Sequence, residues 1–425
     1  MGDNWREMIF EDAVDINLPR KILRGEVAPH ISMDIVQPFN RTIDYFEMKE
    51  FKGSGSRFQN GDTLLARITP CLENGKTAFV SCLPDDAVGH GSTEFIVFSG
   101  KKGISDNLFV YYLSREPDFR NYAIQQMEGS TGRQRVPAKA LSKLAINLPP
   151  LTEQKAIASI LGALDDKIEL NRKMNETLEA MARALFKSWF VDFDPIPGFS
   201  PHKEWQDSPL GKIPKGWRVG NIGNICTVKG GFAYKSETFC DNGYPVIKIK
   251  NINADRTISI DDVEYIPEDI ALKTRDFWLS DGDLIMAMTG ATVGKFGLVI
   301  NKRLVPAVLN QRVAKFFPFQ EHGGLPWFIY GVLQSQEIIE QIITIADGSA
   351  QPNISANGIM SPKIIVPQDK LIKLFNTHVG SMFKQLISNQ KQSRTLASIR
   401  DALLPKLLSG EIRVKDAERF VIEVV

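Results

Sequence analysis

The sequence has few of the residues on which metal, redox and membrane proteins depend. Its 425 residues include four cysteines, which are scattered without the Cys-x-x-Cys spacing of zinc or redox sites. The five histidines form no His-Glu-x-x-His motif and no cluster at metal-ligand spacing. No run of about 18 apolar residues occurs that could span a membrane, and the N-terminus lacks the organisation of a signal peptide. We therefore expect a cytoplasmic protein without a metal site and without contact with a membrane.

Cofactor and catalytic motifs are also lacking. Gly290–Lys295 resembles a phosphate-binding loop, but it has three residues between its glycines where four are needed, and Phe296 follows the lysine. We interpret this segment as a glycine-rich hairpin. Leu148–Leu151 superficially resembles the (N/D)-P-P-(F/Y) motif of amino-methyltransferases, yet it lacks the amide or acid that would bind the target amine. Asp165 and Asp166 are assigned to the solvated face of a helix, so no catalytic site is predicted.

Charge of one sign is not in excess either. Lys and Arg number 51 and Asp and Glu number 50, which gives a formal net charge of +1. This total neither indicates nor excludes nucleic-acid binding, because a basic surface can be local. With 43% hydrophobic residues, the chain has the composition of an ordinary globular protein and is long enough for two or three domains.

The feature that the sequence does have is an internal duplication. Asn171–Lys173 recurs as Asn389–Lys391, and the same spacing of 218 residues carries Ile146–Pro149 onto Ile364–Pro367. This spacing of 218 residues is far longer than the ~20–50 residues of a solenoid unit. The chain is therefore a duplicated module, and two similar halves are expected to contact two similar partners or sites.

Each half is predicted to be a β-rich module followed by a long helix. The first module has short apolar runs bounded by Gly, Asp or Ser, which are typical of strands, with helices near Ser105–Leu113 and Pro117–Gln126. From Leu151 to Trp189 there is no proline, and Thr152 is the expected N-cap, so a helix roughly 55 Å long is predicted. The predicted boundaries are residues 1–150 for the first module, 151–190 for its helix, 191–216 for a linker, 217–367 for the second module, 368–410 for its helix, and 411–425 for a tail that forms a strand.

Both long helices carry a heptad seam of apolar residues with a polar centre. Asn171 and Asn175 occupy the centre of the first seam, and Asn389 and Ser393 occupy the centre of the second. Because a single helix with such a seam is not stable alone in water, we expect the two helices to pack against each other antiparallel. We hypothesise that the central polar residues meet and fix the register. The alternative is that they face solvent.

The segment Leu148–Asp165 resembles the specificity (S) subunit of type I restriction-modification systems. Its "PPLxEQ" start of a long helix is distinctive of that family, and so are Gly61–Arg67, its partner Gly282–Ala287, and the loop Gly348–Ser355. The resemblance covers essentially the whole chain. Two departures occur: Glu128–Val136 is more basic than the corresponding "SxQPNIS"-like loop, and the second long helix lacks the "PPLxEQ" start.

This resemblance implies an α+β fold in which two β-rich target-recognition domains are joined by two long helices that form an antiparallel coiled coil with pseudo-two-fold symmetry. Each domain would read one half of a bipartite target in double-stranded DNA, and the coiled coil would set the spacer between the halves. Two methylation subunits, which methylate adenine N6, and restriction subunits would dock on the chain. The chain itself would be non-catalytic and bind no cofactor; S-adenosylmethionine, ATP and Mg are expected on the partner subunits only.

DNA-binding residues are expected on turns and loops that can reach a groove. Phosphate contacts position a protein on DNA and base-edge contacts specify sequence, with Arg favoured on guanine and Asn or Gln on adenine. For any single candidate, a solvated surface residue is the competing interpretation, and the Arg133–Arg135 cluster is the favoured contact. The candidates are Arg67, Lys76, Arg133, Gln134 and Arg135 in the first module, and Lys229, Tyr234, Lys235, Lys248, Lys250, Lys295, Arg312, Gln351 and Asn353 in the second.

Three other functions remain open at this point. The chain could be the specificity subunit of a combined restriction-methylation enzyme that cuts on both sides of its site. It could be a coiled-coil adaptor whose β modules bind protein or glycan. A free-standing methyltransferase is disfavoured, because the cofactor and amine-binding motifs are missing.

Overall fold

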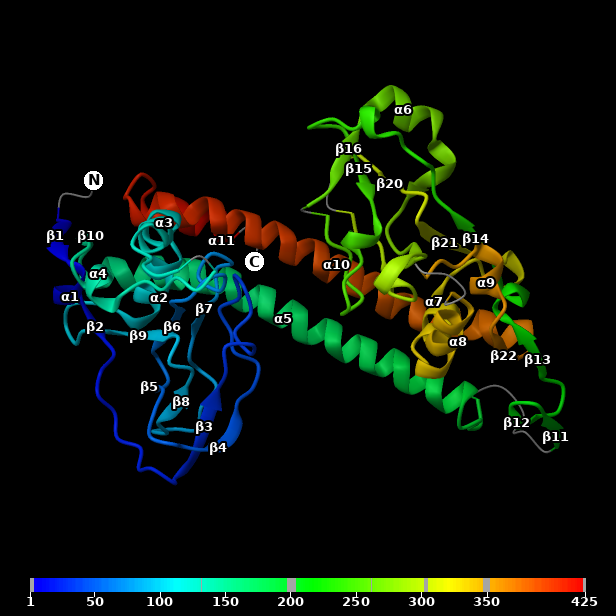
Figure 1. Cartoon of the computed structure of the whole chain (residues 1–425), viewed down its shortest axis with the longest axis horizontal. Coiled ribbons are helices and arrows are strands. Elements are labelled where there is room, and N and C mark those ends of the chain that lie inside the picture. Colours follow the sequence, from blue (N-terminus) through cyan, green and yellow to red (C-terminus); the bar gives the residue numbers. More distant parts are fainter. Residues whose placement is uncertain are drawn as a thin grey trace. The chain divides into compact units, whose positions relative to one another are not determined.

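The computed structural model describes residues 4–130, 132–196, 204–260, 262–301, 305–346 and 352–422. The chain divides into two compact units, each of which combines one β-rich module with a part of each long helix (Figure 1). Unit 1 comprises Met1–Leu170 and Thr395–Val425, and unit 2 comprises Asn171–Arg394. Each unit has a hydrophobic core of its own. Among the described residues, no helix is long and apolar enough to cross a membrane.

Unit 1 holds the first β-rich module. Its elements are β1 (Arg6–Ile9), α1 (Phe10–Ala13), β2 (Val14–Ile16), β3 (Val27–Ile31), β4 (Glu47–Glu50), β5 (Ser56–Phe58), β6 (Thr63–Ala66), β7 (Thr77–Phe79), β8 (Gly89–Gly91), β9 (Phe95–Gly100), α2 (Asn107–Arg115), α3 (Pro117–Gln125), α4 (Ala138–Ser142) and β10 (Ala145–Leu148). They form one sheet of order β2-β9-β6-β7, a second of order β4-β3-β8-β5, and a ribbon of β1 with β10. The helices α2 and α3 lie where the sequence predicts them.

Unit 2 repeats this order. Its elements are β11 (Trp205–Ser208), β12 (Gly211–Pro214), β13 (Arg218–Asn221), η1 (Ile222–Asn224), β14 (Cys226–Gly230), η2 (Ser236–Thr238), β15 (Tyr244–Ile247), η3 (Ile249–Asn251), β16 (Glu264–Ile266), α6 (Glu268–Lys273), η4 (Arg275–Phe277), β17 (Trp278–Leu279), β18 (Leu284–Ala287), η5 (Gly290–Thr292), β19 (Phe296–Leu298), β20 (Ala307–Leu309), β21 (Val313–Pro318), η6 (Gln320–His322), α7 (Trp327–Leu333), α8 (Gln336–Ala346), α9 (Ala356–Met360) and β22 (Lys363–Val366). The sheets are β14-β21-β18-β19 and β16-β15-β20-β17, with the ribbon β13-β22.

The two modules therefore share one strand order, which is the structural form of the sequence duplication. In each, one sheet is antiparallel throughout, and the other contains a single parallel pair, β3 with β8 in unit 1 and β15 with β20 in unit 2. The segment Gly290–Lys295 connects the antiparallel strands β18 and β19, so its interpretation as a hairpin is confirmed.

The two long helices form as predicted. They are α5 (Leu151–Phe190) and α10 (Asp369–Leu408), each with 40 residues and therefore about 60 Å long. Thr152 is not the N-cap of α5, because the helix begins at Leu151 and Thr152 is already inside it: the Pro150 carbonyl accepts the N–H groups of Glu153 and Gln154. Glu153 lies in the first turn, as predicted.

Gln154 ties the start of α5 to the first β-rich module. It is completely buried, and its side-chain amide donates to the carbonyls of Ile104 and Pro149 at 2.9 and 2.8 Å. Its side-chain oxygen accepts the N–H of Asp106 at 2.9 Å. A buried amide that forms three hydrogen bonds fixes the direction in which the helix leaves the module.

Within unit 2, α5 and α10 run antiparallel, because residues later in α5 contact residues earlier in α10. Asn171 donates to the Ser393 hydroxyl and Asn175 to the Leu386 carbonyl, both at 3.3 Å. Asn389 donates to the Asn175 side-chain oxygen at 2.9 Å. With Asn171 and Asn389 only 2% and 4% exposed, the prediction that the central polar residues meet is confirmed. Their role in fixing the register stays a hypothesis.

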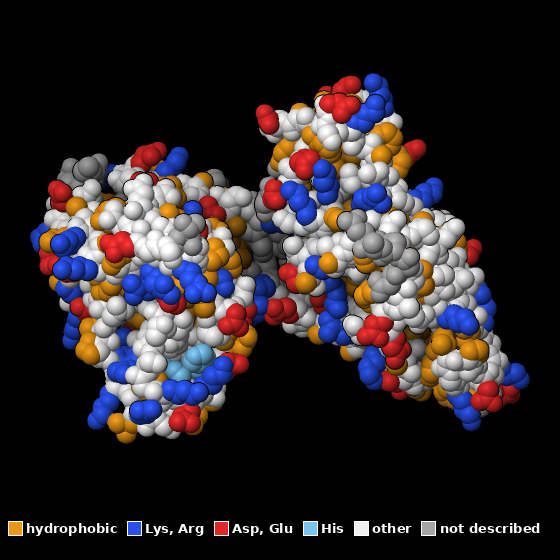
Figure 2. Space-filling view, viewed as in Figure 1, with side chains coloured by type: hydrophobic (Ala, Val, Ile, Leu, Met, Phe, Trp, Pro, Cys, Tyr) orange, Lys and Arg blue, Asp and Glu red, His pale blue; other side chains and the backbone are white. Residues whose placement is uncertain are grey.

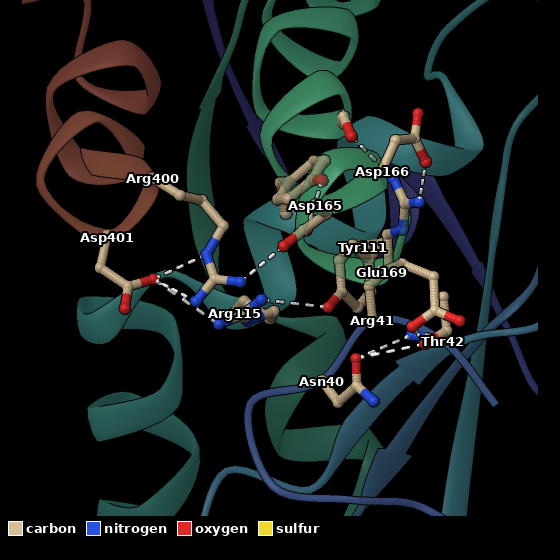
Figure 3. Close-up of polar contacts among 12 residues, drawn as sticks. Asn40, Arg41, Thr42, Tyr111, Arg115, Asp165, Asp166, Glu169, Arg400 and Asp401 are labelled. Atoms are coloured by element: carbon tan, nitrogen blue, oxygen red, sulfur yellow. Dashed lines mark hydrogen bonds and ion pairs between the residues drawn. The ribbon is translucent and has the colours of Figure 1, made fainter. Parts of the chain in front are cut away.

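Within unit 1, the same two helices meet through a buried ion pair. Asp165 of α5 accepts from the Arg400 guanidinium of α10 (Figure 3). It also accepts from the Tyr112 hydroxyl at 2.7 Å. The Asp165 and Arg400 side chains are 4% and 6% exposed. The assignment of Asp165 to a solvated helix face is therefore wrong, since its carboxylate faces α10 and the module. Asp166 is 71% exposed and fits that assignment.

The tail and the linker also differ from expectation. The tail forms a helix, α11 (Val414–Ile422), and no strand is found in its described part. Ala417 and Val421, which are four residues apart, are buried in the core of unit 1, so the segment has the spacing of an amphipathic helix. The segment predicted as a linker, residues 191–216, contains the hairpin of β11 and β12.

Candidate nucleic-acid interface

The basic loop of unit 1 folds onto the turn that follows β6. Arg67 accepts the N–H of Val136 through its carbonyl at 2.9 Å and donates its own N–H to the Glu94 carbonyl at 2.9 Å. Ile68 and Arg135 form a β-bridge. Three segments, around residues 67, 94 and 135, are therefore held side by side. The backbone brings together four of the predicted residues: Arg67, Arg133, Gln134 and Arg135.

These four residues differ in the hydrogen bonds and ion pairs that they already form within the protein. Arg133 is exposed, and among the described residues its hydrogen bonds involve the backbone alone: its N–H donates to the Ser130 carbonyl, and its carbonyl accepts from the Arg135 guanidinium. The Arg135 guanidinium binds Glu94 through Nε at 2.9 Å and Nη2 at 2.8 Å, and this hydrogen bonding raises the pKa of Arg135. The backbone of Gln134 pairs with Thr69 at 2.8 and 3.0 Å. Arg133 is thus the free cation of the loop as far as the described residues show, whereas Arg135 carries its own counterion.

A hollow beside this loop was missed by sequence reasoning. It has a volume of about 290 Å³, and we call it the arginine pocket because Arg20, Arg57 and Arg67 line it, together with Asn17 and Ser56. Only Arg67 was among the predicted residues. Nothing in the sequence distinguishes Arg20 or Arg57, because their proximity to Arg67 follows from the order of strands in two sheets. The remaining candidate, Lys76, is half-buried, and its ammonium group donates to the Met33 carbonyl at 2.8 Å.

Unit 2 builds the same frame with other side chains. Met288 accepts the N–H of Ile354 at 2.9 Å and donates to the Arg312 carbonyl at 3.0 Å, as Arg67 does with Val136 and Glu94 in unit 1. Thr289 and Asn353 form the bridge that corresponds to the one between Ile68 and Arg135. Arg312 and Asn353 are exposed at this turn, and Lys295 is half-buried nearby in the same turn. Gln351 lies outside the described residues.

The other predicted residues of unit 2 lie apart from this frame in the sequence, and some of them already form ion pairs within the protein. Lys250 pairs with Asp262 at 3.0 Å, and Lys248 pairs with Glu264 and lies 4.0 Å from the Phe239 ring centroid. Lys229 on β14 is exposed, with its ammonium group 5.5 Å from the Phe317 ring centroid, and Lys235 is exposed.

Tyr234 is the predicted residue that the structure contradicts. It is 8% exposed, packs with Val246 and Ile266 in a small core, and its hydroxyl lies 3.1 Å from the Thr274 hydroxyl. Burial raises its pKa. A side chain with both its ring and its hydroxyl engaged in the core cannot reach a DNA groove, so Tyr234 is a structural residue.

The charged side chains are unevenly distributed. Figure 2 shows Lys and Arg gathered in local clusters on the visible surface of each unit, with Asp and Glu between them. The net charge of +1 therefore conceals locally basic surface. Among the described residues, no group of three or more His, Cys, Asp or Glu is placed to hold a metal ion.

Comparisons with known proteins agree with this architecture. The model of the type I restriction modification DNA specificity domain matches residues 40–180 and again residues 214–392. The MjaIX specificity subunit of a type I restriction enzyme of Methanocaldococcus jannaschii is 30% identical over 311 residues, which is 72% of this chain and 69% of the relative. The HindI specificity subunit of Haemophilus influenzae is 26% identical, and the alignment covers 96% of this chain and 100% of that subunit.

One solved structure has the same fold. The S subunit of a type I restriction-modification system from M. genitalium superimposes with a TM-score of 0.59 at 16% identity, over 95% of this chain and 96% of that chain. At this identity the likeness concerns the fold alone. It includes the two β-rich modules and the long helices described above.

Proposed function

Since this chain belongs to the family of type I restriction-modification DNA specificity subunits, as its motifs indicate, we propose that each β-rich module reads one half of a bipartite DNA target. The observation that supports this proposal most strongly is the repeated frame. The same backbone hydrogen bonds hold the turn after β6 in unit 1 and the turn after β18 in unit 2. The side chains on the two frames differ, as two different half-sites require.

Three pairs of positions carry the difference between the frames. Arg67 of unit 1 corresponds to Met288 of unit 2, and Glu94 corresponds to Arg312. Arg135, which is paired with Glu94, corresponds to Asn353. Arg135 of unit 1 and Arg312 and Asn353 of unit 2 supply the base-edge chemistry, because Arg is suited to guanine and Asn to adenine in the major groove, and the two frames present these side chains at different positions. The DNA contacts of all the predicted residues other than Tyr234 remain part of this proposal.

The long helices and the partner subunits complete the proposed function. We propose that α5 and α10 set the spacer between the half-sites and that two methylation subunits, followed by restriction subunits, dock on the chain in the cytoplasm. The chain would be non-catalytic, and S-adenosylmethionine, ATP and Mg would be bound by the partners. The names of the relatives as specificity subunits support the assignment of DNA recognition, and not catalysis, to this chain.

The test is to express the chain with its methylation subunits and to map methylated adenines in the host genome. We expect a target with two defined halves and an undefined spacer of fixed length, and no such methylation when the chain is omitted. A contiguous target, or methylation that does not depend on the chain, would contradict the proposal. Cleavage on both sides of the site would assign the chain to a combined enzyme, while an absence of methylation with glycan or protein binding would support the adaptor alternative.

A further inference from the structure

The arginine pocket of unit 1 holds more positive charge than the described residues neutralise. Arg20 donates to the Asp62 carboxylate at 2.8 Å, and its side chain is 11% exposed. Arg57 and Arg67 have no ion pair with any described residue, and none of the residues that line the pocket is acidic. The guanidinium charges of Arg57 and Arg67 therefore lie at one partly enclosed pocket that no carboxylate lines. An anion bound in the pocket would compensate these charges.

The same two arginines have hydrogen-bond donors to spare. The Nε atoms of Arg57 and Arg67 are buried and have no partner among the described residues. The Arg57 guanidinium is nevertheless held in place, since it donates to the Arg20 carbonyl at 2.8 Å and its central carbon lies 4.9 Å from the Phe51 ring centroid. Buried polar groups are nearly always hydrogen-bonded, so two unpaired donors on two arginines that line one hollow favour the binding of an acceptor there.

We propose that the arginine pocket is an oxyanion site that holds one backbone phosphate of the DNA half-site read by unit 1, an inference that rests on the proposed function. Phosphate offers several acceptor oxygens and a full negative charge to guanidinium groups, which bind it in bidentate geometry. Asn17, Ser56 and Thr93, which also line the pocket, add polar groups of the kind that contact phosphates.

The recessed position of the arginines favours a phosphate over a base edge. Base edges lie inside the grooves, and a side chain must project from the protein to reach them. Phosphates project from the duplex and can enter a hollow. Arg57 and Arg67, whose Nε atoms are buried, are placed for the second kind of contact, and the exposed Arg133 is placed for the first.

Unit 2 lacks this arrangement among its described residues. Met288 stands at the position of Arg67, and Asp283, which corresponds to Asp62, pairs with Lys315 instead of an arginine. The proposed phosphate site is therefore specific to unit 1. The two halves of the target should consequently differ in how strongly the affinity depends on salt.

The test uses the full chain assembled with its methylation subunits and a duplex that contains the target mapped from methylated adenines. Arg57→Gln and Arg67→Gln should each lower the affinity roughly tenfold and reduce the slope of log affinity against log salt by about one. Discrimination between the target and its single-base variants should not change. Lys102→Gln, which removes an exposed charge of unit 1 outside the pocket, is the matched control and should change neither quantity.

A scan with neutral methylphosphonate linkages then locates the phosphate. One position in the first half-site should weaken binding of the unmodified chain tenfold and have no further effect on Arg67→Gln. An unchanged salt slope, a loss of discrimination at one base pair, or the absence of any phosphate position coupled to Arg67 would overturn the proposal. Unfolding midpoints equal to that of the unmodified chain exclude misfolding of the variants. Failure of the proposed function is distinguishable, because the unmodified complex would then show no preference for any DNA target.

Discussion

The two units share one strand order, yet each attaches its β-rich module to the long helices by a different kind of interaction. In unit 1, Asp165 of α5 accepts from the Tyr112 hydroxyl and from the Arg400 guanidinium. Arg115 of the module lies 3.7 Å from Asp401, which itself binds Arg400 (Figure 3). The attachment is a network of charges and hydrogen bonds built around the buried pair of Asp165 and Arg400.

In unit 2, aromatic rings occupy the corresponding positions. Phe383, 218 residues after Asp165, stacks on Trp327 with ring centroids 4.1 Å apart and lies 5.3 Å from the Tyr330 ring. Ala182, 218 residues before Arg400, is buried in the same core. One fold is thus compatible with two chemistries at its helix contact. The ionic version depends on every partner being present, whereas the aromatic version depends on buried area.

Removing one partner of the ionic network should give the largest effect. Arg400→Met leaves the Asp165 carboxylate buried without its cation, and we expect the free energy of unfolding of unit 1 to fall by about 3–5 kcal/mol. Denaturant unfolding followed by circular dichroism measures this change. Asp165→Phe combined with Arg400→Ala copies the pairing of unit 2 and should recover most of the loss. If Arg400→Met unfolds like the unmodified chain, the ionic network does not stabilise unit 1.

A second prediction concerns a property that the two units have in common. Burial raises the pKa of Tyr111 in unit 1 and of Tyr330 in unit 2 to about 12. Because the unfolded chain has a tyrosine pKa of about 10, stability that is fully present below pH 10 should be lost as the pH rises to 12, by about 1.4 kcal/mol per pH unit for each tyrosine.

Denaturant midpoints at pH 9, 10 and 11 measure this loss, with absorbance at 295 nm reporting tyrosinate. Tyr111→Phe and Tyr330→Phe should each reduce the pH dependence by a similar amount. Tyrosinate that forms at these two positions near pH 10 in the folded protein would show that the two rings are not shielded as the structure indicates.

A third prediction compares the base-reading positions of the two frames. Asn353→Ala should relax the preference at one base pair of the second half-site by about 1–3 kcal/mol, because a bidentate contact is lost. Arg135→Ala should also weaken binding of the first half-site to any sequence, because Glu94 is then left without its cation and faces the DNA. Binding of the complex to duplexes with single-base changes measures both effects. If both variants changed base-pair preference and overall affinity to the same extent, the different roles assigned to the two frames would be wrong.

The smallest energetic effect should come from lengthening the helices. One heptad inserted into both α5 and α10 keeps the seam in register and adds about 10 Å, close to three base pairs. The mapped spacer should grow by that amount, while both half-sites stay the same. A heptad of the same length inserted into α5 alone would break the pairing of Asn171 with Asn389 and serves as the control. If the double insertion left the spacer length unchanged, the proposal that the helices set the spacer would be contradicted.

The parts of the structure that depend on local periodicity were the ones predictable from sequence. The two long helices follow from their apolar spacing, and the pairing of their polar centres follows from the constant spacing of the repeat. Asp165 was misplaced because its burial depends on Arg400, which lies 235 residues away in the chain. The tail was misassigned because α11 is short and acquires its partner only in the folded core.

The candidate interface shows the same division. The turn after β6 and the loop around Arg133 could be predicted from motifs, and the repeat alone places Arg312 and Asn353 opposite Glu94 and Arg135. The arginine pocket could not be predicted, because Arg20 and Arg57 reach Arg67 only through the order of strands in two separate sheets. The sequence does not distinguish basic residues that are free to bind DNA from those that are buried or paired within the protein. Only the folded structure separates the two groups.

The most direct test of the two-reader proposal is to exchange one reading loop and map the methylated adenines again. Glu128–Val136 of unit 1 would be replaced by the nine-residue sequence of Ala346–Ile354 from unit 2, since both segments end on the same backbone contact with the preceding frame. If each module reads its own half, the first half-site should change while the second half-site and the spacer length stay the same. A map in which both halves change, or in which neither does, would contradict the proposal.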